Sequence, residues 1–200
     1  MSELRVNTIS ENTSGNGVAI DSVTLKDGGA TLTDNITFSA SGKGVHLGVT
    51  SATASNLLDD YEEGSFTPVL RDNDTGGNTA SISSSTAQYV KIGRMVYIAI
   101  NMFNINKSGM TSSNVLYLTG LPFTSAGTSN NGMFSRHPMS VEVDSIDFTG
   151  YVTADATAGG FTRMDFHDNV DSAGDTQLTV SDITTSSDSD ILINGWYLAV

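Results

Sequence analysis

The sequence predicts an all-β protein, with a thin N-terminal β shaft and a C-terminal antiparallel β-sandwich of jelly-roll type. Apolar residues alternate with polar ones in many short runs, which is the pattern of half-buried strands. Turns rich in Gly, Asn, Asp and Ser separate these runs at intervals of about 8–12 residues. The chain of 200 residues is long enough for one ordinary domain, or for a stalk followed by a smaller domain.

Residues 1–50 contain strands that are too thin to bury a face within one chain. The first two runs flank a Ser-Gly-Asn-Gly turn, which predicts a hairpin. Because isolated two-stranded hairpins are marginal in water, we expect three chains to wind together and bury the apolar positions along a common axis. The alternative is a disordered leader rich in Gly, Ser and Thr. The apolar positions in order are Val6, Val18, Ile20, Val23, Leu25, Leu32, Ile36, Phe38, Val45 and Leu47.

Residues 51–64 predict a short helical connector, with the helix over Ser55–Glu63. Ser55 or Asn56 can cap it, and Gly64 can end it. The predicted helix contains both an apolar stripe and a cluster of acidic residues. A catalytic pair of carboxylates would need a concave, partly buried setting. A solvated polar face is therefore the simpler interpretation of the acidic cluster. The stripe is Leu57, Leu58 and Tyr61, and the acidic residues are Asp59, Asp60, Glu62 and Glu63.

Residues 65–200 predict the sandwich. Phe66–Leu70 forms a first strand whose proline favours an edge position. Gln88–Ile105 forms the strongest strand pair, with a turn at Gly93-Arg94. Its second strand is apolar on both faces, with Tyr97, Ala99, Phe103 and Ile105 opposite the main apolar set. We therefore expect it to be central, between two layers or between a layer and a neighbouring chain.

Further strands are expected towards the C-terminus. A slip in the alternation at Asp144-Ser145 predicts a bulge. The last strand is apolar up to its end, so we expect it to be buried in the core or at a subunit contact. The predicted strands are Val115–Thr119, Ser140–Phe148, Tyr151–Thr153, Phe161–Phe166, Leu178–Ile183 and Ile191–Val200.

Composition excludes several classes of partner. The net charge of −13 and the scattered basic residues argue against nucleic acid and anionic lipid. Cysteine is absent, so there are no disulfides and no thiolate chemistry. The polar start Met1–Arg5 predicts no signal peptide, and the longest apolar stretch, Met95–Ile100, is too short to insert into a membrane.

The residues predict no enzyme, cofactor or metal site. His46, His137 and His167 lie in different segments, and no nucleophile elbow, zinc-protease motif or phosphate loop is present. The acidic run Asp72–Gly76 has oxygen donors at alternate positions, as a calcium loop would. A second run, Asp165–Asp171 with Asp175, offers oxygen donors and the His167 imidazole to a metal. Asp, Asn and Gly are also the residues that turns require, and this interpretation is preferred.

Loop residues with aromatic or basic side chains are the candidates for receptor binding. Arg136 and His137 stand out because positive groups are scarce in this acidic chain. The alternative is that the aromatic residues fill the core and that Arg136 pairs with a carboxylate. The remaining candidates are Tyr151, Phe161, Arg163, His167 and Asp168.

Three segments carry a resemblance to a known family. These segments are Thr13–Ala30, Asn56–Leu70, which contains the string LLDDYEEG, and Tyr89–Arg94. They resemble segments of tail fibre and tail-tip proteins of tailed bacteriophages, especially marine and cyanobacterial phages. The resemblance implies a homotrimer in the virion tail, with a shaft that attaches to other tail proteins and a tip that binds a host surface glycan or outer-membrane protein. Alternatives are a virion appendage or baseplate connector that contacts only virion proteins, and a polysaccharide depolymerase.

Overall fold

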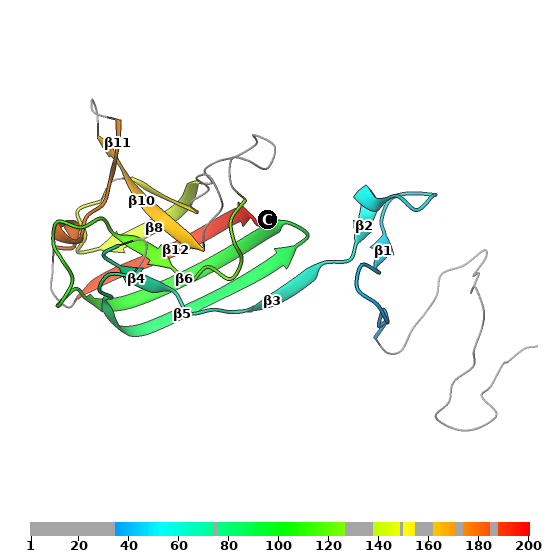
Figure 1. The fold of residues 1–200 in the computed structure, drawn as a ribbon, viewed down its shortest axis with the longest axis horizontal. Coiled ribbons are helices and arrows are strands. Elements are labelled where there is room, and N and C mark those ends of the chain that lie inside the picture. The colour runs from blue at the N-terminus through cyan, green and yellow to red at the C-terminus, as the bar shows by residue number, and fades with distance from the viewer. Residues whose placement is uncertain are drawn as a thin grey trace, which may run out of the picture. The chain divides into compact units, whose positions relative to one another are not determined.

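A computed structural model of the chain describes residues 35–73, 76–126, 138–148, 150–154, 162–170, 174–184 and 188–200. Over these residues the protein is all-β and its strands pair antiparallel, as the sequence predicts (Figure 1). Contacts divide the chain into two units, Met1–Phe38 and Ser39–Val200. The strands predicted before residue 35 lie outside the described residues, so the fold below is that of the second unit.

Apart from the small β1–β2 pair described below, ten strands form one hydrogen-bonded sheet. Their path runs β3-β5-β6-β12-β8-β9-β10-β7-β4, and β11 pairs with β10 beside this path. The strands are β3 (Tyr61–Ser65), β4 (Val69–Arg71), β5 (Ser81–Ile92), β6 (Met95–Asn106), β7 (Tyr117–Thr119), β8 (Pro138–Asp144), β9 (Tyr151–Ala154), β10 (Arg163–Val170), β11 (Gly174–Gln177) and β12 (Ser189–Leu198).

Strand β8 connects two halves of this sheet. Its residues 140–144 pair with β12, whereas Pro138 and Met139 pair with β9. We call β3, β5, β6, β12 and the C-terminal part of β8 the long-strand half, and the remaining strands the short-strand half. Close packing of β8 on β12 requires Gly195, because a Cβ there would lie 2.6 Å from Met139 Cγ.

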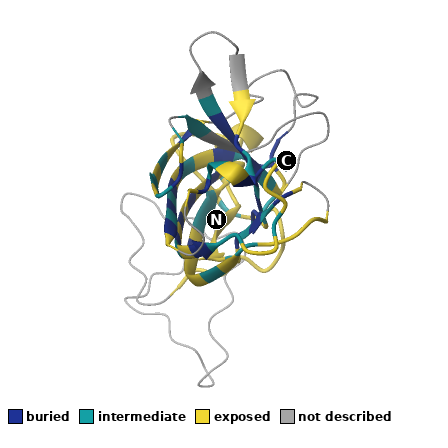
Figure 2. Ribbon diagram, turned by 90° about the vertical axis from the view of Figure 1, so that its left-hand side faces the viewer, coloured by how far each residue is buried: buried dark blue, intermediate teal, exposed yellow. Residues whose placement is uncertain are grey.

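The two halves share one hydrophobic core. Alternate residues of the long strands face inward and meet apolar residues of the short strands, so the buried residues (dark blue in Figure 2) line the inside of the fold. Core residues of the long-strand half include Val96, Ile98, Ile100, Met102, Ile191, Ile193 and Tyr197, and those of the short-strand half include Leu70, Leu118, Met164 and Phe166.

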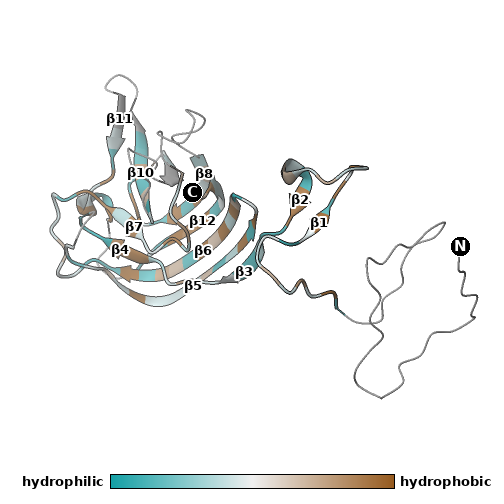
Figure 3. Cartoon of the chain, turned by 45° about the vertical axis from the view of Figure 1, so that its right-hand side comes forward, coloured by the Kyte–Doolittle hydropathy of each residue, from teal (hydrophilic) through white to brown (hydrophobic). Residues whose placement is uncertain are grey.

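Strand β6 is central, as predicted, but only one of its faces is buried. Tyr97 is 47% exposed and Ala99 is also exposed, so no second layer among the described residues covers this face. Ile105, predicted to share that face, is buried. The reason is a bulge: Asn104 has a φ of 53°, and two residues of β6 stand opposite Asp190 of β12. Hydrophobic residues (brown) recur along β6 in Figure 3.

The helix predicted over Ser55–Glu63 is wrong. Ala54–Asn56 form one 3₁₀ turn, Leu57–Leu58 (β2) pair with Val45–His46 (β1), and the predicted helix end at Gly64 lies inside strand β3. The physical reason is pairing at long range: β3 forms a five-residue antiparallel ladder with β5, and this outweighs a weak local helical preference.

Smaller differences appear near the C-terminus. The segment predicted as strand Leu178–Ile183 contains a 3₁₀ turn, Val180–Asp182, because Asp182 accepts hydrogen bonds from the backbone and hydroxyl of Thr179. The bulge predicted at Asp144-Ser145 is wrong: β8 ends at Asp144 instead of continuing to Phe148, because Ser145 has a φ of 57°, which strand residues do not adopt. The last strand is only half buried within the chain, since Trp196 and Val200 are exposed, and its burial at a subunit contact stays a prediction.

Candidate functional site

The structure brings together some of the predicted binding residues. Arg136, His137 and Phe161 lie outside the described residues. Tyr151 and His167 are register partners on β9 and β10, and their rings stack with centroids 5.4 Å apart. Asp168 follows His167 directly, so strand alternation places it on the other face of β10.

The face of β10 that points away from the hydrophobic core is polar, yet its side chains are largely buried. Arg163, Asp165 and His167 alternate with the core residues of this strand, and His167 is only 4% exposed. The Arg163 guanidinium lies 4.9 Å from the centre of the Tyr117 ring, and its Nε lies 3.4 Å from Asp165 Oδ1. These contacts join β10 to β7 and β9. Side chains so little exposed are better suited to fixing the strands than to binding a large ligand.

Asp72, from the first acidic run, binds backbone groups. Its carboxylate accepts hydrogen bonds from the backbone N–H groups of Asn78 at 2.6 Å and Thr111 at 2.7 Å, and from Asn78 Nδ2 at 3.0 Å. Burial alone would raise its pKa, but these hydrogen bonds outweigh burial and lower the pKa below its ordinary value. Asp72 therefore closes a turn. Within the described residues, no three acidic or histidine side chains gather as a metal site would need.

Two adjoining hollows lie on the outer face of the long-strand half. Their volumes are about 520 and 380 Å³, within the range of ligand pockets, and Tyr97 and Ala99 line both of them. The first extends towards β3 and β5, and the second towards β12 and β8. Because the hollows share two residues of the central strand β6, they lie next to each other across the strands, and we call the pair the cross-strand groove.

The floor of the groove is one straight row of residues. Register partners on neighbouring strands lie directly opposite each other and on the same face. Five residues from five adjacent strands are therefore aligned, through the successive pairings Ser65–Gln88, Gln88–Ala99, Ala99–Asn194 and Asn194–Ser140. All except Ala99 have a hydroxyl or amide side chain.

Tyr97 forms one wall of the groove, because it lines both hollows, and Trp196 lies beside it on β12, next to the residues that line them. Tyr97 and Trp196 are register partners two residues along from the floor row, and they are 47% and 45% exposed. The opposite wall contains the paired residues Asn101 and Leu192. Glu63 lines the first hollow and Glu142 the second, and they are the only charged residues among the described lining residues.

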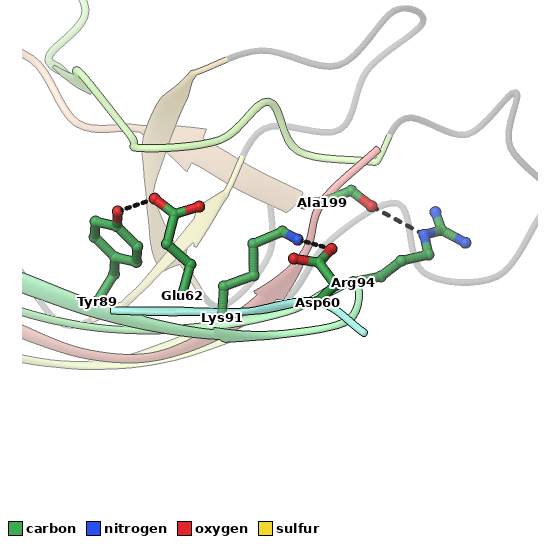
Figure 4. Close-up of polar contacts among 6 residues, drawn as sticks. All are labelled: Asp60, Glu62, Tyr89, Lys91, Arg94 and Ala199. Atoms are coloured by element: carbon green, nitrogen blue, oxygen red, sulfur yellow. Dashed lines mark hydrogen bonds and ion pairs between the residues drawn. The ribbon is translucent and has the colours of Figure 1, made fainter. Parts of the chain in front are cut away.

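Contacts on the core side of β5 hold the edge strand β3 in place. Lys91 forms an ion pair with Asp60, and Tyr89 donates a hydrogen bond to Glu62, which raises the pKa of Tyr89 (Figure 4). The Tyr89 ring also packs edge-on against Phe123, at 5.3 Å between centroids. These contacts fix the β3 end of the groove floor.

At the turn between β5 and β6, a further contact fixes the C-terminal end of the chain. Arg94 Nε donates a hydrogen bond to the carbonyl of Ala199 at 3.0 Å (Figure 4). The backbone N–H of Ala199 in turn donates to the carbonyl of Arg94 at 2.7 Å. The segment that follows Trp196 is therefore tied to the same strands that carry the groove.

Sequence reasoning missed the groove residues. The sequence predicts Tyr97 and Ala99 only as a second apolar face, and it predicts that the last strand, with Trp196, is buried in the core or at a subunit contact. The available signal was the alternation of small and amide residues with aromatic ones on that second face. No protein-family model and no curated protein matches this chain. Within the described part of the chain, no helix is long and apolar enough to span a membrane.

Proposed function

We propose that this chain is the subunit of a homotrimeric tail fibre or tail tip of a tailed bacteriophage, and that it binds the host cell surface without catalytic turnover. In this proposal residues 1–50 form a β shaft that attaches to other tail proteins. Residues 65–200 form a jelly-roll-like β-sandwich tip. The resemblance of the segments around Thr13–Ala30 and Asn56–Leu70 to such proteins supports the assignment.

The observation that supports the trimer is the exposure of apolar side chains in residues 35–58. The β1–β2 pair in this segment has only two residues in each strand, and a two-stranded unit is marginal in water. Association with other copies would cover the exposed side chains and remove their contact with water. These side chains are Ile36, Phe38, Val45, Leu47, Val49 and Leu58.

Charge supports the same segment as the contact between copies. The chain has 22 acidic residues, yet none lies between Asp34 and Asp59. Copies with a net charge of −13 each repel one another at most surfaces. A segment that has exposed apolar residues and no carboxylate is where three such copies can meet without like-charge contacts.

Analytical ultracentrifugation of the whole chain tests the trimer. We expect a mass three times the 21.0 kDa of one chain. Leu47→Asp should shift the population towards monomer, because it places a carboxylate at each of three symmetry-related contacts. Val200→Asp, which changes a residue that is also exposed but lies outside the segment, should remain trimeric. A stable wild-type monomer refutes the proposal.

Binding to bacteria tests the second part of the proposal. Fluorescently labelled protein, incubated with a panel of marine cyanobacteria and heterotrophic bacteria, should label a restricted set of strains. A trimer that labels none of them, but binds purified tail or head proteins, would instead be a virion appendage or connector. Release of reducing sugar from host polysaccharide would indicate a depolymerase.

A further inference from the structure

We propose that the cross-strand groove binds a glycan chain that is neutral or carries amino groups, with sugar rings packed against Tyr97 and Trp196. This inference deepens the proposed function, and it rests on that function for the source of the glycan, the host surface. It assigns recognition to a strand face and not to Arg136 and His137.

The dimensions of the groove suit an extended polar chain. Its floor crosses five neighbouring strands, and four inter-strand spacings of about 4.8 Å make a row of about 19 Å. The two hollows along it, of about 520 and 380 Å³, are both open to a ligand that passes over Ala99. A linear ligand several units long can occupy both, whereas a compact one fills only one.

The floor offers hydrogen bonds of both kinds. Gln88 and Asn194 each provide an amide oxygen that accepts and an NH₂ group that donates, and the hydroxyls of Ser65 and Ser140 do both. Sugar hydroxyl groups are likewise both donors and acceptors, so a row of such side chains matches a row of sugars. Ala99 lies at the centre of the row, and its short side chain leaves depth there for a ring.

Tyr97 and Trp196 supply the apolar part of the contact. The flat face of a sugar ring has outward C–H groups, which pack well on an exposed aromatic ring. Tyr97 and Trp196 lie side by side on strands paired in register, so both are held by the sheet and lose little freedom on binding. Two such large aromatic residues left half exposed next to each other are unusual for a surface that binds nothing.

Charge selects among glycans. Among the described residues that line the hollows, only Glu63 and Glu142 are charged, one in each hollow, and the chain as a whole has a net charge of −13. Sulfated, phosphorylated and uronic-acid polymers would be repelled along the whole groove. A neutral polymer would bind without this penalty, and an amino sugar could pair with either carboxylate.

A second copy of the chain suits the groove less well. The centre of an interface between copies is usually apolar, whereas the floor here consists of serine and amide side chains around one alanine. The apolar segment free of carboxylates, residues 35–58, already offers a better contact between copies. A polar ligand is therefore favoured in the groove.

Trp196 provides the test, since it is the single tryptophan of the chain. The full-length protein is applied to a microarray of neutral, amino and anionic glycans, and the best binder is then titrated while tryptophan fluorescence is recorded. We expect binding to neutral or amino glycans only. We also expect a saturable change in fluorescence and protection of Trp196 from acrylamide quenching.

Variants then locate the ligand. Trp196→Ala should weaken binding by about tenfold or more, the loss expected for one well-packed aromatic contact. Ala99→Gln keeps the tryptophan and blocks the floor, so both binding and the fluorescence change should be lost. Met95→Ala is the control, because Met95 is also 45% exposed on the same face but lies two residues farther from the floor row than Tyr97 and Trp196 do. It should bind like the wild type, and thermal melts should confirm that all three variants are folded.

The groove proposal is overturned if the protein binds no neutral or amino glycan, or if Ala99→Gln binds with unchanged affinity. It is also overturned if folded Trp196→Ala has a different oligomeric state, because this face would then be a contact between copies. The two proposals fail separately. Bacteria that bind wild type and Ala99→Gln equally well would refute the groove and leave adhesion standing. Glycan binding with a fluorescence change, but no binding to bacteria, would refute adhesion and leave the groove standing.

Discussion

The buried hydroxyl of Tyr197 joins the last strand to the segment before residue 127, and its removal gives a sharp test of the structure. Tyr197 is fully buried on β12. Its hydroxyl donates a hydrogen bond to the carbonyl of Phe123 at 3.0 Å and accepts one from the N–H of the same residue at 3.2 Å. Tyr197→Phe keeps the ring and leaves both backbone groups of Phe123 without this partner.

We expect Tyr197→Phe to lower the free energy of unfolding by about 1–3 kcal/mol, the cost of leaving buried polar groups unsatisfied. For a protein of this length each kcal/mol corresponds to roughly 2–4 °C in melting temperature. Tyr97→Phe is the matched control, because it removes the same atom from an exposed ring on the neighbouring strand. Its effect should stay within about 0.5 kcal/mol. Urea unfolding at one fixed protein concentration measures both.

Alkaline pH gives a second readout of the same group. Burial raises the pKa of Tyr197 above the value of about 10 that it has in the unfolded chain. The folded state then holds its proton more tightly, so this contribution to stability is fully present below pH 10 and is lost as the pH rises further. Tyr197→Phe should show a smaller alkaline loss than the wild type. Equal stability of Tyr197→Phe and Tyr97→Phe would refute the reasoning.

Three further predictions concern the acidic turn, the two faces of β6 and assembly. Asp72→Asn should destabilise the fold by about 1–3 kcal/mol at pH 7 in urea unfolding. Because the pKa of Asp72 is lowered in the folded state, the difference between wild type and variant should shrink as the pH falls below about 4. A difference that stays constant with pH would contradict the role of the Asp72 carboxylate in closing the turn. Ile98→Asp should be insoluble when expressed, whereas its neighbour Ala99→Asp should be soluble with a native melting transition, since only Ile98 is buried. Sedimentation should show tighter trimers at 150 mM than at 10 mM NaCl, because salt screens repulsion between acidic copies; the opposite trend would mean that ion pairs drive assembly.

The sequence predicted those elements whose signals are local. The β5–β6 hairpin follows from two alternating runs around Gly93-Arg94, and Gly93 does adopt a positive φ of 56°. The slip in alternation at Asp144 is also local, but it marks the end of β8 and not the bulge that the sequence predicts. In each case the residues that decide the structure are neighbours in the chain.

The elements that were missed depend on partners far away in the sequence. The run around Tyr61 has apolar spacing compatible with a helix, but it becomes a strand because it pairs with β5. Side-chain contacts between residues 27 and 31 positions apart in the sequence, Tyr89–Glu62 and Lys91–Asp60, support this pairing. The groove needs the register of five strands at once, from Ser65 on β3 to Ser140 on β8. No single stretch of sequence contains that information, so the sequence alone does not single out the residues of the groove.

Placing a binding site on the face of β6 has a consequence that a loop site would not have. The inner residues of β6 pack in the core while Tyr97 and Ala99 face the groove, so the same ladder of hydrogen bonds fixes both. A site on such a rigid support keeps its spacing, and the loss of freedom on binding is small. Substitutions in the floor row would therefore change which glycan binds without altering the core. Three rigid copies held together by residues 35–58 would add avidity, because the first bound site raises the effective concentration of glycan at the other two.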